Sequence, residues 1–318
     1  MSFFTDPLDY EFFRQGLIVA TLVGALCGAM GVFIVLRRMS YIGHGLSHAA
    51  FGGAVVGYLM NISFFIGAGL WAFVAAILIN AAGRRRNIGA DAAIGIVTTA
   101  SFALGVALIS KKRAFTRNFE AALFGNILGV SREDIMIIGG VSIAVGLAIF
   151  FFYKQLLFTT FDEEIAAVSG VPTRWIETGF ALALAATIVA SMNIVGVTLI
   201  AAAIVIPPST ARLLTHSFGP LLILSTIIGA ATGFFGMFVS FEYDIASGAA
   251  IVLLGTAFFM AAYLGTGIWH HLQPQEASNA REPAYGSLQP QPLDLAVSAF
   301  TETKRTPLDA MTTEGRAD

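Results

Sequence analysis

Long stretches without a charged side chain constrain this sequence more than any other feature. No Lys, Arg, Asp or Glu occurs in residues 15–36, 39–83 or 178–211. A helix needs about 20 apolar residues to cross a bilayer, so each stretch is long enough for one or two crossings. Charged residues make up only 12% of the chain, whereas soluble domains carry about 25%. The sequence therefore excludes a water-soluble globule and predicts an all-α polytopic membrane protein.

Nine transmembrane helices are predicted, with eight as the alternative. The choice depends on residues 178–211, which hold either one long tilted helix or two short helices broken near Asn193 and Gly196. Pro207 and Pro208 are expected to end that region, because proline donates no backbone hydrogen bond. The apolar runs lack the alternating pattern of a membrane β-barrel. The nine expected crossings are 16–36, 44–60, 63–82, 92–110, 135–153, 178–192, 194–207, 220–240 and 246–268.

Basic residues orient these crossings. With the N-terminus outside and nine helices, Arg37 with Arg38, Arg84–Arg86 and Arg212 fall on the inner side, as the positive-inside rule favours. A basic run that begins at Lys111 falls on the outer side and violates the rule at one loop. A partial or re-entrant segment over residues 114–130 is the alternative there.

The two ends of the chain differ from its middle. Residues 1–15 carry acidic side chains before any basic one, the reverse of a cleavable signal, and are expected to form an amphipathic N-terminal segment. Residues 16–271 are the expected transmembrane domain. Residues 272–318 combine Gln-Pro repeats with Ser, Thr and scattered charge. Such a composition cannot bury enough apolar surface to fold, which predicts a disordered polar tail.

Several function classes are excluded by what the sequence lacks. The net charge of −2 offers no general attraction for nucleic acid. No Gly-x-x-x-x-Gly-Lys-Ser/Thr loop is present, so any energy from ATP must come through a partner. The single cysteine, Cys27, excludes an internal disulfide and a multi-cysteine metal site. Glycine pairs four residues apart, such as Gly24 with Gly28 and Gly229 with Gly233, are expected to let helix backbones approach closely.

Two histidines inside an apolar segment are the candidate binding residues. His44 and His48 are four residues apart, so on a helix both imidazoles lie on one face about 6 Å apart along the axis. Two nitrogens at that spacing could reach one metal ion, and neutral histidines satisfied by carbonyls are the structural alternative. A zinc protease uses this spacing with Glu directly after the first His, where this chain has Gly45. An ion-coupled secondary transporter is a further alternative, but no internal repeat supports it.

The segment Asp162–Gly170 is the second informative stretch. Its first three residues are acidic, which suits the start of a helix, and Gly170 followed by Pro172 suits its end. The pattern predicts a short amphipathic helix on the inner side. Such a helix could dock into a groove on a soluble partner, and an ordinary connecting helix is the alternative.

Taken together, these motifs resemble the membrane permease of bacterial ABC importers for zinc, manganese or iron. The resemblance covers residues 10–270. The motifs that carry it, in chain order, are Arg37-Arg38-Met39, Ile42-Gly43, Leu46-Ser47-His48-Ala49, Asp91 with Ile94-Gly95-Ile96, Leu123-Phe124-Gly125, Asp162–Gly170, Val195-Gly196 and Pro208-Ser209-Thr210-Ala211-Arg212.

The resemblance implies a multi-pass protein of the bacterial cytoplasmic membrane that is not itself an enzyme and holds no permanent cofactor. It implies a homodimer or paired permease, two cytoplasmic ATP-binding subunits and an extracytoplasmic metal-binding protein. The segment near residue 165 is similar to the family's coupling helix, which seats in the ATPase. Its expected coupling residues are Asp162, Glu163, Glu164, Ala166 and Gly170.

The resemblance also implies that His44 and His48 bind the metal in the translocation path. Family members commonly have aspartate at the position of His44, within a Gly-Asp-Ala-Leu-Ser-His-Ala pattern, so His44 is a departure. Imidazole suits zinc, whereas carboxylate oxygen suits manganese. Zinc is therefore the favoured cargo from the sequence, with manganese or iron as the alternative. Two protomers would bring four imidazoles together on a twofold axis.

Overall fold

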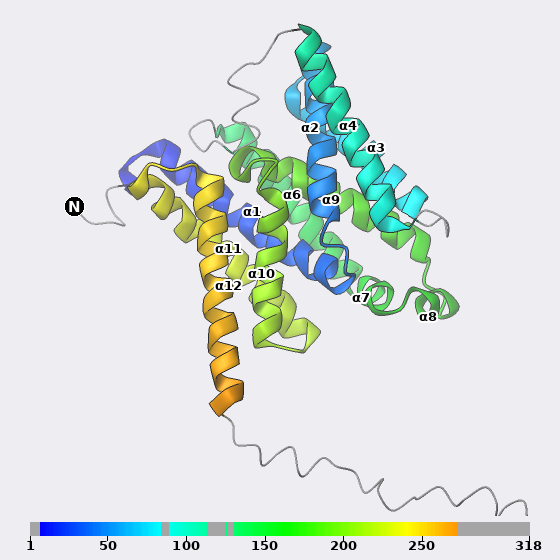
Figure 1. Cartoon of the computed structure of the whole chain (residues 1–318), viewed down its shortest axis with the longest axis vertical. Coiled ribbons are helices and arrows are strands. Elements are labelled where there is room, and N and C mark those ends of the chain that lie inside the picture. The colour runs from blue at the N-terminus through cyan, green and yellow to red at the C-terminus, as the bar shows by residue number, and fades with distance from the viewer. Residues whose placement is uncertain (1–6, 84–88, 113–124, 126–129, 273–318) are drawn as a thin grey trace, which may run out of the picture. The chain divides into compact units, whose positions relative to one another are not determined.

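The computed structural model describes residues 7–83, 89–112, 125 and 130–272, and the regular structure in these ranges is helical. Figure 1 shows the helices in chain order. Their bounds are η1 (Pro7–Asp9), α1 (Glu11–Leu36), α2 (Ile42–Leu59), α3 (Phe64–Gly83), α4 (Ala90–Lys112), α6 (Arg132–Phe151), α7 (Tyr153–Phe161), α8 (Glu163–Val168), α9 (Thr173–Val195), α10 (Ile200–Leu214), α11 (Phe218–Tyr243) and α12 (Ser247–Leu272).

Each of the nine expected crossings coincides with one helix of the described residues. In chain order these helices are α1, α2, α3, α4, α6, α9, α10, α11 and α12. Among the described residues, 7 helices are long and apolar enough to cross a membrane. The other two differ for separate reasons: α10 has only 15 residues, and α2 contains two histidines and five glycines, which lower its mean hydropathy. The predicted fold class, an all-α polytopic membrane protein, is confirmed.

A glycine separates α9 from α10. Gly196 has φ 81° and ψ 149°, a backbone conformation that is open to glycine and unfavourable for other residues. Helix α9 ends at Val195 and α10 begins at Ile200. The long uncharged stretch 178–211 therefore holds parts of two helices, as the nine-helix prediction requires.

The expectation that Pro207 and Pro208 end this region is wrong, because α10 continues through both to Leu214. A proline inside a helix leaves the carbonyl four residues earlier without its donor. For Pro208 that carbonyl belongs to Ile204, and it lies so close to Gly31 of α1 that any side chain on Gly31 would collide with it. Packing of α10 on α1 thus stabilises a helix that the local sequence disfavours.

Small residues bring α1 and α11 into backbone contact. A Cβ atom on Gly24 would overlap the carbonyl of Gly229, and a Cβ atom on Gly229 would overlap the carbonyl of Gly24. One turn further along, the hydroxyl of Ser225 donates a 2.6 Å hydrogen bond to the carbonyl of Gly28. The packing role predicted for these glycines is confirmed.

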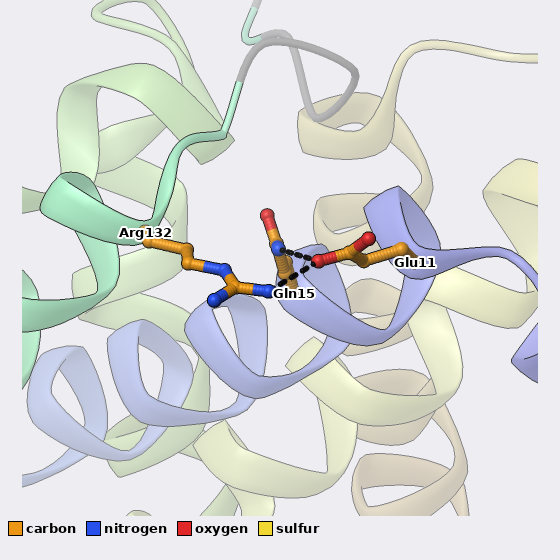
Figure 2. Close-up of polar contacts among 3 residues, drawn as sticks. All are labelled: Glu11, Gln15 and Arg132. Carbon is orange, nitrogen blue, oxygen red and sulfur yellow. Dashed lines mark hydrogen bonds and ion pairs between the residues drawn. The ribbon is translucent and has the colours of Figure 1, made fainter.

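An exposed ion pair joins the beginnings of α1 and α6 (Figure 2). Arg132 Nη2 donates to Glu11 Oε1 at 2.9 Å, and Gln15 Nε2 donates to the same oxygen at 3.1 Å. Exposed pairs of this kind contribute about 0–1 kcal/mol. The contact therefore contributes little to the stability of the fold. Its effect is to hold the two helix ends next to each other.

The chain divides into two compact units, Met1–Gly267 and Ile268–Asp318. The second unit is described only over residues 268–272, where it forms the end of α12. The expected polar tail over 272–318 lies outside the described residues apart from its first member. Most of the candidate re-entrant segment 114–130 lies outside them as well.

The contact between α1 and α11 generates a prediction for stability. Gly24→Ala inserts a methyl group where the Gly229 carbonyl lies, so we expect a loss of about 1–3 kcal/mol, the usual range for overpacking. The matched control is Gly140→Ala on α6, where a Cβ atom would meet nothing within 4 Å. Thermal unfolding of the detergent-solubilised protein measures both. Equal melting temperatures for the two variants would show that the backbone contact is not tight.

Candidate metal site and coupling segment

His44 and His48 lie one turn apart near the beginning of α2. Their ring centroids are 4.3 Å apart, and the ring planes cross at 78°. Both side chains are partly exposed. A metal ion takes imidazole nitrogen at about 2.0–2.1 Å, so rings this close can offer one nitrogen each to a shared ion.

Aromatic rings flank the pair on both sides. The Tyr41 ring lies 5.2 Å from the ring of His44, and the Phe102 ring of α4 lies 4.9 Å from the ring of His48 at an angle of 81°. Edge contacts between aromatic rings restrict their orientation. The two imidazoles are therefore held by neighbours that do not use their nitrogens.

The turn between the histidines is packed on two sides. Gly45 faces α4 so closely that a Cβ atom there would lie 2.5 Å from Ile94 Cγ2 and 2.6 Å from Thr98 Oγ1. The fully buried hydroxyl of Ser47 lies 2.9 Å from the carbonyl of His44 and 3.0 Å from the carbonyl of Val197. Val197 belongs to the break between α9 and α10. Ser47 thus attaches the histidine helix to that break.

Two buried polar atoms, one in the histidine pair and one next to it, have no hydrogen-bond partner in the described part of the chain. They are His48 Nδ1 and the hydroxyl oxygen of Thr98. Buried polar groups in native proteins are nearly always paired with protein, water or a ligand. The interface of α2 and α4 therefore has polar capacity that the fold itself does not use.

The described residues contain no group of three or more His, Cys, Asp or Glu side chains that could hold a metal ion. The chain alone therefore brings two imidazoles together rather than a full tetrahedral set. The residue after His44 is Gly45, packed against α4, so no carboxylate stands where a metalloprotease has its general base. Hydrolytic chemistry has no support in this geometry.

The segment Asp162–Gly170 forms the short helix that its sequence predicts. Asp162 is the N-cap of α8, and its carboxylate accepts a 2.9 Å hydrogen bond from the backbone N–H of Ile165. Glu163 and Glu164 occupy the first turn, where their charge complements the helix dipole. Gly170 follows with φ 82°, a left-handed conformation that ends the helix.

The side chains of α8 divide into a buried side and an exposed side. Ala166 is fully buried within its own chain, and its carbonyl accepts a 3.0 Å hydrogen bond from Val171 N–H. Val168 is 91% exposed and Ile165 is 58% exposed. Ala166 therefore packs α8 onto the rest of the chain, while Val168 and Ile165 are its apolar surface.

A cavity of about 430 Å³ lies away from both features, between the beginning of α1 and the turn from α11 to α12. Its lining includes Phe12, Phe241 and Asp244 but no histidine. Asp244 is the left-handed C-cap of α11, with φ 51°. This cavity is thus separate from the candidate metal site.

A sequence profile of a known family matches most of the chain. Residues 9–266 match the ABC 3 transport family. The chain belongs to the ABC 3 transport family. It is therefore a permease subunit of an ABC transporter rather than an enzyme, and it is a multi-pass protein of the cell membrane.

Curated relatives match most of the length of this chain. The manganese transport system membrane protein MntC of Halalkalibacterium halodurans is 39% identical over 261 residues, which are 82% of this chain and 89% of the relative. The manganese import system permease protein ScaB of Streptococcus gordonii is 36% identical over 255 residues, 80% of this chain and 91% of the relative. A probable iron transport system membrane protein of Haemophilus influenzae is 33% identical over 257 residues, covering 81% and 94%.

Solved structures agree with the family assignment. PsaBC from Streptococcus pneumoniae in complex with Fab matches with a TM-score of 0.74 at 36% identity, covering 82% of this chain and 94% of that one. A metal-chelate type ABC transporter in an inward-facing conformation matches with a TM-score of 0.65 at 17% identity, covering 79% and 85%, and this match shows the fold alone. The expected fold of a metal-type ABC importer permease is confirmed.

Sequence reasoning missed the residues that support the histidines. Ser47 was part of a family motif without a role, and Thr98 was not singled out. The signal for Ser47 is its place between the two histidines, where a polar side chain in an otherwise apolar helix needs a partner when it is buried. No local signal marks Thr98, because its importance comes from contact with Gly45 across two helices.

The Ser47 contact predicts a stability effect. Ser47→Ala leaves the buried Val197 carbonyl without this donor, and we expect a loss of about 1–3 kcal/mol. Ser142→Ala on α6 is the control, because the buried Ser142 hydroxyl has no hydrogen-bond partner among the described residues. Chemical denaturation of the two variants in detergent compares them. A Ser47→Ala protein as stable as the control would show that α2 does not depend on the α9–α10 break.

Proposed function

We propose that this chain is the permease of an importer that carries a divalent transition metal inward, driven by ATP hydrolysis on separate cytoplasmic subunits. The observation that carries the proposal is the His44–His48 pair, two imidazoles 4.3 Å apart on a helix of an ABC 3 family permease. Imidazole is a common ligand of divalent transition metals. The unpartnered Nδ1 atom of His48 supports the same role.

Manganese is the cargo that the relatives favour. Both MntC of Halalkalibacterium halodurans and ScaB of Streptococcus gordonii are named for manganese, and the Haemophilus influenzae relative is named for iron. Zinc is the second candidate, because a site built from imidazole alone suits zinc better than manganese. His44 is the residue on which this choice depends.

Two protomers would complete the ligand set. One chain supplies His44 and His48, whereas zinc sites normally take four protein ligands or three with a water. A twofold axis through paired permeases presents the same two residues from each side. Four neutral imidazoles would leave the ion's charge of +2 uncompensated in a low-dielectric bundle. Weak binding follows, and weak binding suits a protein that must release its cargo.

The segment Asp162–Gly170 is proposed to couple the permease to its ATPase. Its exposed apolar residues, Ile165 and Val168, stand beside the acidic first turn of α8. An exposed apolar patch with a charged rim is typical of a protein contact. Because Ala166 packs α8 against the rest of the chain, a displacement of α8 would also displace the helices that it contacts.

The remaining expectations complete the proposed assembly. Paired permeases, ATP-binding subunits inside and a metal-binding protein outside form the transporter. Residues 16–271 are its transmembrane domain, flanked by an amphipathic segment over 1–15 and a polar tail over 272–318. An ion-coupled carrier is the alternative of another class, and dependence on the ATPase separates the two.

Metal uptake tests the histidine pair directly. In proteoliposomes that contain the permease and its ATPase, with the metal-binding protein supplied outside, His48→Ala should lower uptake of radioactive manganese and zinc by more than about tenfold, since substitutions outside the ligand shell alone cause 10–100-fold losses. His44→Asp should retain uptake and shift preference towards manganese, because carboxylate oxygen suits that ion. His216→Ala, an exposed histidine between α10 and α11, is the control. Wild-type uptake by a His44→Ala/His48→Ala protein would eliminate the site.

Binding of the ATPase tests the coupling segment. Val168→Asp places a charge on the most exposed apolar side chain of α8, so the ATPase should dissociate on purification and transport should stop. Tyr243→Asp is the matched control. The Tyr243 side chain is 71% exposed, and it lies at the end of α11 that faces outside in the expected orientation. Normal recovery of the ATPase with Val168→Asp would reduce α8 to a connecting helix.

A further inference from the structure

One charged side chain joins three helices at the C-terminal end of α1. Arg37 is the C-cap of α1, and its Nε and Nη2 atoms donate hydrogen bonds to Thr160 Oγ1 at 3.2 Å and Thr159 Oγ1 at 3.0 Å on α7. Its guanidinium carbon lies 4.6 Å from the ring centroid of Phe180 on α9. This distance is within the range of a cation–π contact. Arg37 therefore ties α7 and α9 to the end of α1.

The two acceptors are oriented before Arg37 reaches them. The Thr160 hydroxyl donates to the carbonyl of Leu156 at 2.6 Å, and the Thr159 hydroxyl donates to the carbonyl of Gln155 at 3.0 Å. With each hydroxyl proton directed at its own helix, the oxygen lone pairs are available to the guanidinium. The rigid fork of arginine fits two such fixed acceptors, whereas lysine offers a single ammonium group.

The surroundings make this position unusual for a positive charge. Burial lowers the pKa of the Arg37 guanidinium, and the carboxylates of Glu177 and Glu163 act in the opposite direction. Glu163 is the first residue of α8. Arg37 therefore interacts with the coupling segment in two ways: electrostatically with Glu163, and indirectly through its hydrogen bonds to α7.

Arg37 is close in the chain to both functional segments. Thr160 is followed by Phe161 and then by Asp162, the N-cap of α8. On the other side, Arg38 takes a left-handed conformation with φ 57°, and a hydrogen-bonded turn leads directly into α2. Its bonds run from Met39 N–H to Ile34 O at 3.0 Å and from Ile42 N–H to Met39 O at 2.9 Å.

The connection from Arg37 to the histidines is short and stiff. His44 follows two residues after Ile42, the first residue of α2, and the hydrogen bonds of Met39 and Ile42 close the turn before it. A rigid turn transmits a displacement instead of absorbing it. Movement of Arg37 would therefore tilt the beginning of α2, where the candidate ligands lie.

An apolar cavity gives this junction room to move. It measures about 260 Å³ and is bordered by Met30 of α1, Ile149 of α6, Leu156 of α7 and Phe180 of α9. Close-packed protein interiors resist displacement, whereas side chains that border a hollow have space in which to shift. Phe180, the ring beneath Arg37, forms part of its wall.

We propose that Arg37 is the residue that carries movement of the coupling segment to the metal helix. This inference rests on the proposed function and adds a positioning residue to it. When the ATPase displaces α8, α7 moves with it, and the two hydrogen bonds from Thr159 and Thr160 pull on Arg37. The α1–α2 turn then shifts the beginning of α2. Without the link, the ATPase would still hydrolyse ATP, but the histidines would not change their exposure.

Two independent substitutions break the link from opposite sides. Arg37→Gln removes the donor, and the double variant Thr159→Val/Thr160→Val removes both acceptors while keeping the side-chain shape. Arg38→Gln is the matched control for charge, because the adjacent Arg38 side chain is exposed. Thr226→Val controls for loss of a threonine bond within a helix, since the Thr226 hydroxyl donates to Leu222 O at 2.7 Å.

The first measurement is the number of ATP molecules hydrolysed per metal ion imported by the assembled complex in proteoliposomes. Breaking the link should lower uptake about tenfold, within the range usual for coupling between two sites, while ATP hydrolysis stays near the wild-type rate. The two controls should keep the wild-type ratio. An unchanged ratio in both test variants, or a parallel loss of assembly and ATPase activity, would overturn the proposal.

The second measurement does not depend on cargo. A fluorophore on Ser40→Cys, in a Cys27→Ala background, reports the environment of the α1–α2 turn when ATP is added to the complex. The signal should change in the otherwise unsubstituted protein and in Arg38→Gln but not in Arg37→Gln. A full signal change in Arg37→Gln would refute the link. Failure of the wild-type complex to import any metal would instead refute the proposed function, which the fluorophore signal does not require.

Discussion

Backbone contact between helices is the constraint on which the rest of this structure depends. In a bilayer, apolar side chains gain little by leaving lipid for protein, so helices associate through close packing and hydrogen bonds. Gly24 and Gly229 meet in this way, and so do Gly31 and the Ile204 carbonyl. These contacts place α10 and α11 against α1. They therefore fix the position of the C-terminal end of α1, from which a short turn leads into α2.

The candidate site uses the same packing for a different purpose. Gly45 lets α4 approach the turn between His44 and His48, and Ser47 attaches that turn to the α9–α10 break. The histidines are thereby positioned by neighbours that leave their nitrogens available. A fold that satisfied every polar atom here would have nothing to offer an ion. Local inconsistency of this kind is expected where a protein binds or moves something.

The sequence predicts the helices well because the bilayer imposes a simple rule. Charge-free runs of sufficient length must be helical, and all nine expected crossings coincide with helices in the described chain. The local rule for Pro207 and Pro208 failed because contact with α1 outweighs the missing donors. Ala166 was named as a coupling residue, but α8 is too short for periodicity to reveal its buried face. The contacts of Arg37 with α7 and α9 join residues more than 100 positions apart, and nothing in a single sequence indicates such a pairing.

The composition of α2 has a consequence for how the protein reaches its membrane. Polar residues within a segment raise the free energy of its transfer from the translocon into lipid, and α2 carries two histidines and five glycines. Its neighbours α1 and α3 are apolar enough to cross a membrane, whereas α2 is not. Insertion of α2 should therefore depend on these neighbours during synthesis, so that the residues that equip this helix to handle an ion also make it a poor anchor by itself.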